Sequence, residues 1–170
     1  MRAQNGGLAG LARDRPLLTL GLAILAVELV GASGAVFTAQ GLDGWYDTLV
    51  LPALAPPNWV FAPVWTSLFA LMGVAVWRIW RRAPDRPRAV TLALGVFAGH
   101  FVLNLGWSAV FFGQQAIGPG LIVIAALWLA IVATILAFDR VDRPAALLLV
   151  PYLAWVSFAT SLNYQLWLLN

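Results

Sequence analysis

Long stretches of apolar residues, separated by short polar segments, cover most of this chain of 170 residues. Five stretches stand out, and each has the roughly 20 residues that an α-helix needs to cross the hydrocarbon core of a membrane. Helices also satisfy the backbone polar groups internally, as a lipid environment requires. The pattern therefore predicts one all-α membrane domain over residues 1–170, with five transmembrane helices at 16–39, 60–80, 89–113, 118–138 and 145–169 and a Pro- and Gly-rich loop at 40–59.

The composition narrows the possible functions. The chain is 62% hydrophobic and only 10% charged, whereas soluble domains are about 45–50% apolar and about 25% charged. Cysteine and lysine are absent and there is one histidine, which excludes thiolate chemistry, lysine Schiff bases and a His-rich metal site within one chain. We expect no metal. The arginines that make the chain basic lie between apolar stretches, so we expect no nucleic-acid partner.

The positions of the arginines predict how the chain crosses the membrane. All of them precede the first stretch, lie at the end of the second or between it and the third, or lie between the fourth and fifth. By the positive-inside rule these segments are cytoplasmic, as is the N-terminus. We expect a multi-pass protein of a bacterial cell membrane. A cleaved signal peptide is the alternative for the first stretch, but Glu28 and the length of the run argue against it.

Two faces are predicted for the third stretch from the helical period of about 100° per residue. His100, Asn104 and Trp107 share one face, and because polar groups are costly against lipid this face is expected in the bundle interior. The interior is either a packed network or a ligand pocket, which the spacing does not decide. The opposite face favours close contact between helices, and hence a homodimer, through small residues: Gly95, Gly99 and Gly106.

The fifth stretch and Glu28 supply further candidates. Trp155, Ala159 and Leu162 share one helical face, where a small residue lies between larger ones. This arrangement suits either a flat hydrophobic ligand or close helix packing. Glu28 is the only acid within an apolar stretch. It is a functional candidate for that reason, as a neutral carboxyl, a partner of His100 or part of a proton relay.

Residues 45–47, 52–66, 103–113 and 151–164 together resemble the sequence motifs of the TspO/translocator-protein family, also called tryptophan-rich sensory proteins and peripheral-type benzodiazepine receptors. The resemblance implies a five-helix bundle, usually a homodimer, whose pocket opens towards the loop at 40–59, which would act as its lid. It implies tetrapyrroles such as protoporphyrin IX and haem as ligands, with sterols and isoquinoline or benzodiazepine-type drugs as further ones. Carried over by motif and helical face, the predicted pocket residues are Tyr46, Trp59, Trp65, Phe69, His100, Asn104, Trp107, Trp155, Ala159 and Leu162.

Three functions follow from the resemblance. The first is a membrane receptor or sensor that binds tetrapyrroles and takes part in porphyrin transport, sequestration or regulation, with no cofactor beyond that ligand. The second is an enzyme that degrades porphyrin in light, with Trp65 and Trp155 as candidate catalytic residues. The third is a transporter of small solutes or sterols. The basic residue of the animal sterol motif is missing after Tyr164, so a tetrapyrrole is the favoured ligand.

Overall fold

The computed structural model describes residues 8–42 and 44–170, and in these residues it contains helices and turns but no strand. Five helical segments are long and apolar enough to cross a membrane. The prediction of an all-α membrane protein with five spanning helices is therefore confirmed. The α-helices are α1 (Leu8–Asp14), α2 (Pro16–Leu42), α3 (Phe61–Trp80), α4 (Pro87–Ser108), α5 (Ile117–Asp139), α6 (Arg143–Leu147) and α7 (Val150–Leu169).

The elements differ from the predicted stretches in four places. The short helix α1 precedes the first spanning helix, and α4 continues into a π-helical turn at Ala109–Gly113. The fifth stretch consists of two helices, because Pro151 in the first turn of α7 has no N–H with which to continue α6. The loop at 40–59 is also shorter than predicted, since α2 extends to Leu42 and short 3-10 turns occupy Tyr46–Thr48 and Asn58–Val60.

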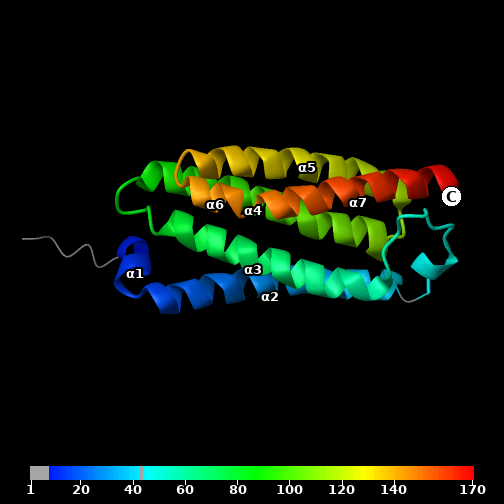
Figure 1. The fold of residues 1–170 in the computed structure, drawn as a ribbon, viewed down its shortest axis with the longest axis horizontal. Coiled ribbons are helices and arrows are strands. Elements are labelled where there is room, and N and C mark those ends of the chain that lie inside the picture. Colours follow the sequence, from blue (N-terminus) through cyan, green and yellow to red (C-terminus); the bar gives the residue numbers. More distant parts are fainter. Residues whose placement is uncertain (1–7, 43) are drawn as a thin grey trace, which may run out of the picture.

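The spanning helices lie roughly parallel to one long axis (Figure 1). Helix α2 packs along α3, while α5 packs against both α4 and α7. The face of α4 predicted to lie inside does so: His100 is 1% exposed, Asn104 3% and Trp107 6%. The outer surface of the bundle is apolar, with exposed leucines such as Leu17, Leu92 and Leu129 on three different helices. This distribution is what a surrounding lipid phase requires.

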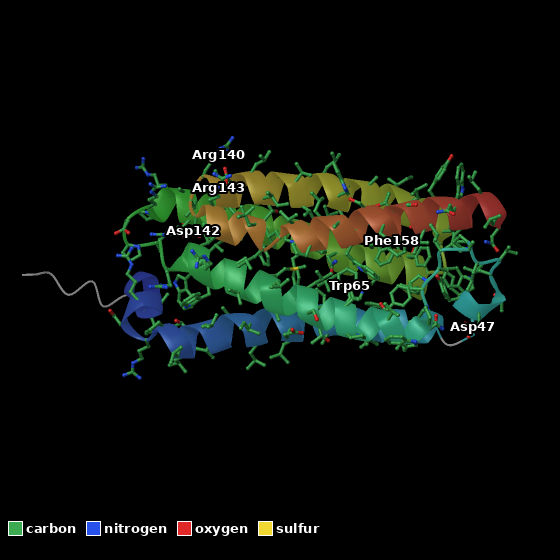
Figure 2. All side chains as sticks on the ribbon, in the orientation of Figure 1. Asp47, Trp65, Arg140, Asp142, Arg143 and Phe158 are labelled. Atoms are coloured by element: carbon green, nitrogen blue, oxygen red, sulfur yellow. The ribbon has the colours of Figure 1, made fainter. Side chains whose placement is uncertain are left out.

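The two ends of the bundle differ in chemistry. One end carries α1, the turn between α3 and α4, and the turn before α6; Figure 2 shows Arg140, Asp142 and Arg143 there. Asp47 lies at the opposite end, where the loop meets the C-terminal end of α7. The arginines of the described chain thus gather at one end, as their spacing predicted, whereas Arg2 lies outside the described residues. Which end faces the cytoplasm remains a prediction.

The last residue of α7's segment holds the loop in place. The Asn170 side chain accepts a hydrogen bond from the Val50 N–H at 2.9 Å and donates to the Val50 carbonyl at 3.2 Å. Its amide also donates to the Leu166 carbonyl at 3.0 Å, which fixes its orientation on the helix. A residue 120 positions away therefore pairs with one exposed backbone unit of the loop.

Candidate ligand-binding cavity

A partly open cavity of about 300 Å³ lies between α2, α3 and α4, with Asn58 of the loop at its edge. Its volume falls at the lower end of the range of small-molecule sites, which are mostly apolar with a few polar groups. Trp65 and Phe69 of α3 form an aromatic wall, with ring centres 5.3 Å apart. These residues are four apart on one helix, so they lie on the same face.

Helix α2 supplies the opposite wall with small side chains. Gly31, Ala32, Gly34 and Ala35 line the cavity, and their small size leaves space beside Trp65. A Cβ at Gly31 would collide with the Phe69 ring, so a glycine is needed for the two helices to approach here. No residue of α2 was among the predicted pocket residues. The signal that the sequence contained was this run of small residues, which by itself indicates only close packing or a cleavage site.

Polar side chains line the cavity from helices α2 and α4. Glu28 lines it from the middle of α2, and Asn104 and Ser108 line it from α4. In the part of the chain that the structure describes, the lining includes no cationic side chain. Glu28 forms no ion pair with His100, which was one of the alternatives for this carboxyl: the hydrogen bond of His100 goes to Thr134. Among the described residues, Glu28 instead presents the acidic group on the cavity wall.

Asn104 connects the cavity to the bundle interior. Its side-chain amide donates to the Tyr152 hydroxyl at 3.0 Å, and both residues are buried. The Tyr152 ring lies 6.1 Å from that of Trp65 and 5.7 Å from that of His100. Asn104 thus links the aromatic lining of the cavity to the buried Tyr152. Its hydrogen bond satisfies the tyrosine hydroxyl.

His100 belongs to the packed interior. The Thr134 hydroxyl donates its single proton to the Ala130 carbonyl at 2.8 Å, so its 3.2 Å contact with His100 Nδ1 requires a proton on that nitrogen. Nε2 is buried and has no hydrogen-bond partner among the described residues.

A second, smaller hollow of about 20 Å³ adjoins the cavity, since Phe61 lines both. Such a volume holds about one water molecule. Trp107 is fixed on its wall because its indole N–H donates to Asn163 at 3.3 Å, and Asn163 donates to the Ile117 carbonyl at 2.9 Å. The sequence-predicted residues on this hollow are Tyr46, Trp107, Ala159 and Leu162.

The predicted pocket residues therefore divide into three groups. Trp65, Phe69 and Asn104 line the larger cavity, and four others line the small hollow. Trp59, His100 and Trp155 line neither. Trp59 is 73% exposed in the loop, whereas Trp155 is half-buried with its ring 6.2 Å from Phe61.

The predicted dimer face lies apart from both cavities. Gly95 and Gly99 are exposed on α4, Gly106 is partly exposed, and a Cβ at any of the three would meet nothing within 4 Å. This is an open, small-residue strip on the outside of the bundle. The homodimer stays a prediction.

The fold and the cavity define a multi-pass helical membrane protein with an intramembrane site of ligand size. Comparison with known proteins makes the class specific. The model of the TspO/MBR family matches residues 23–168. The chain is 46% identical over 161 residues to the tryptophan-rich protein TspO of Chlorobaculum tepidum, a match that covers 92% of this chain and 99% of that protein.

Two other relatives have different names. The tryptophan-rich sensory protein of Cereibacter sphaeroides is 38% identical over 149 residues, covering 86% of this chain and 91% of that protein. The translocator protein of Bos taurus is 37% identical over 143 residues, covering 84% and 85%. The chain belongs to the TspO/MBR family, and the predicted resemblance is confirmed.

Proposed function

We infer that the protein is a membrane receptor for tetrapyrroles, of which protoporphyrin IX and haem are the type, and that it takes part in their sensing, sequestration or transport. The observation that carries this inference is the cavity between α2, α3 and α4. It combines the Trp65 and Phe69 rings, on which a flat macrocycle can stack, with the smooth wall of small residues on α2. No cofactor is needed for such a role.

The geometry suggests how a macrocycle would be held. One edge would enter beside Trp65 and the small residues Gly34 and Ala35 of α2, because Phe69 already packs on Gly31, while the remainder extends through the open side. Asn104 offers its amide at the inner end, already oriented by Tyr152. Ordered donors of this kind fix the orientation of an otherwise apolar ligand. The relative named a sensory protein accords with a receptor role.

Phe69 and Phe97 provide a matched test. Both are buried phenylalanines, at 7% and 8% exposure, but only Phe69 lines the cavity. Purified protein in detergent would be titrated in the dark with protoporphyrin IX, with quenching of tryptophan fluorescence as the readout. Phe69→Leu should weaken binding by about tenfold, the value of one aromatic stacking contact. Phe97→Leu should lower stability and leave the affinity unchanged.

The same samples separate the receptor from the enzyme. Under illumination a receptor keeps the porphyrin spectrum, whereas an enzyme yields a new absorbing product that is lost in Trp65→Phe. Absence of saturable binding, or equal weakening by both phenylalanine variants, would contradict the proposed ligand site while leaving the fold and family unaffected.

A further inference from the structure

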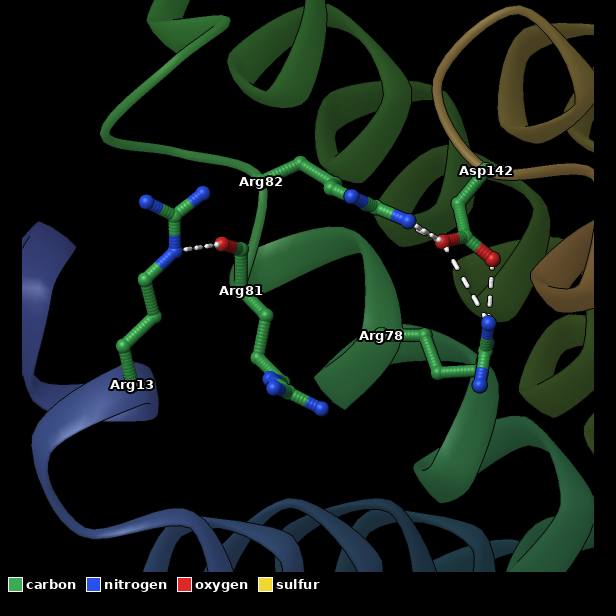
Figure 3. A pocket seen from close by; sticks show the side chains of 5 residues that line it. All are labelled: Arg13, Arg78, Arg81, Arg82 and Asp142. Carbon is green, nitrogen blue, oxygen red and sulfur yellow. Dashed lines mark hydrogen bonds and ion pairs between the residues drawn. The ribbon is translucent and has the colours of Figure 1, made fainter.

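Another cavity lies at the arginine-rich end of the bundle, away from the cavity between α2, α3 and α4 and from the small hollow beside it. It has a volume of about 110 Å³ and is lined by Arg13, Arg78, Arg81, Arg82 and Asp142, which we call the arginine pocket (Figure 3). Its residues come from three separate segments: α1, the end of α3 with the turn that follows, and the turn before α6. Folding therefore brings four guanidinium groups together at one place.

Asp142 accounts for only part of this charge. Its side chain is 2% exposed and accepts hydrogen bonds from Arg78 Nε at 2.9 Å and Arg82 Nη2 at 2.7 Å. It also accepts the Ala145 N–H at 3.1 Å and so caps α6. Burial acts to raise the pKa of Asp142, but the bonds from Arg82, Arg78 and Ala145 hold that pKa below its usual range. Asp142 is thus a saturated acceptor.

The other two arginines face the pocket with less compensation. Arg13 pairs with Asp85, which lies outside the lining, and its Nε donates to the Arg81 carbonyl at 2.9 Å. The Arg81 guanidinium lies over the Trp77 ring at 4.7 Å. No carboxylate of the described residues forms an ion pair with it. Four cations against two anions leave a surplus of positive charge and of N–H donors around a partly open space.

The chemistry of these donors defines the occupant. The planar guanidinium fork matches the oxygens of a phosphate group. The space admits a group of that size and not a whole macrocycle. It lies beside Trp77, whose indole donates to Thr19, at the last turns of spanning helix α3. Tryptophans at helix ends mark the depth of lipid headgroups.

We propose that the arginine pocket binds a phosphate group that carries net negative charge, supplied by an anionic phospholipid headgroup or by free phosphate. Arg81 is the residue that remains available to the ligand, and Arg78 and Arg82 are positioned for it by Asp142. The site is independent of the cavity between α2, α3 and α4, and does not require tetrapyrrole binding.

Arg81→Gln tests the proposal, with Arg88→Gln as the control. Both variants lose one positive charge at the same end, but Arg88 is exposed and outside the pocket lining. Arg81→Gln strands no carboxylate, so the fold should be retained, and an unchanged unfolding temperature checks this. The probes are dioctanoyl phosphatidylglycerol, dioctanoyl phosphatidylcholine and inorganic phosphate, added to protein in a neutral detergent and followed by calorimetry.

Saturable binding of phosphatidylglycerol that Arg81→Gln weakens by about tenfold, with Arg88→Gln unchanged, supports a lipid headgroup as the source. The same pattern with inorganic phosphate alone supports a soluble phosphate. Arg81→Lys keeps the charge but not the fork, and should bind with intermediate affinity. Equal weakening by Arg81→Gln and Arg88→Gln, equal binding of the zwitterionic lipid, or no saturable binding of any probe would overturn the proposal.

Discussion

Replacing Gly73 by alanine should push α2 and α3 apart. A Cβ at Gly73 would lie 2.5 Å from the Ile24 Cα, 3.0 Å from the Ile24 nitrogen and 3.1 Å from its Cγ1. Carbon atoms pack best at about 3.5–4.0 Å, so the helices must separate by about 1 Å at this point. Two of the three atoms belong to the backbone, and a change of rotamer therefore gives no relief. Overpacking of this kind costs about 1–3 kcal/mol.

The control is Gly21→Ala on α2, where a new Cβ meets nothing within 4 Å. Both variants gain the same helix propensity, so their difference in unfolding free energy isolates the packing term. We would measure unfolding of each variant in one detergent and expect Gly73→Ala to be less stable than Gly21→Ala by the amount given above. Because Gly73 is one turn from Phe69, the cavity should also change shape and ligand affinity should fall. Equal stability of the two variants would refute the close approach of α2 and α3.

Two further predictions concern the ends of the bundle. Because the pKa of Asp142 is lowered in the folded protein, its contribution to stability is complete above its ordinary pKa of 3.8 and is lost as the pH falls through the lower value. Asp142→Asn should lower the unfolding free energy by about 2 kcal/mol at neutral pH and should abolish this acid-dependent loss. Thermal unfolding from neutral pH to about pH 3 measures both effects. A variant with the wild-type acid profile would show that the carboxylate is not the group involved. Asn170→Ala should release the loop, so that the Val50 amide exchanges its hydrogen several-fold faster, for the loss of bonds worth about 1 kcal/mol; hydrogen–deuterium exchange measures this, and unchanged protection would mean that other contacts hold the loop.

Hydropathy predicted the spanning helices because the membrane leaves the backbone almost no alternative. The inward face of α4 could be predicted equally well, because the cost of placing His100 and Asn104 against lipid exceeds most packing preferences. Short elements carry no comparable constraint. Helix α1 depends on contacts such as the Arg13–Asp85 pair, whose partners are distant in the sequence.

The cavity was harder to predict from the sequence, for a physical reason. Helical periodicity shows which side of a helix faces inward, but not whether a neighbour or a space meets it there. Trp65 and Phe69 meet a space because α2 is small opposite them, whereas His100 meets Thr134 and Trp155 meets Phe61. Small residues on α2 do not by themselves indicate a binding site. Their role becomes clear only from the cavity that they line.

Three spanning segments separate Asp47 from Asp142 along the chain, and the two residues lie at opposite ends of the bundle (Figure 2). In a membrane they would therefore contact different aqueous phases. The acid sensitivity predicted for Asp142 therefore depends on the pH on one side of the membrane only. In sealed vesicles with uniform protein orientation, acidifying one compartment would titrate this carboxyl and acidifying the other would not. A stability measurement on such vesicles thereby becomes a topology assay that needs no tag: the compartment whose acid destabilises the protein is the one that bathes the arginine pocket.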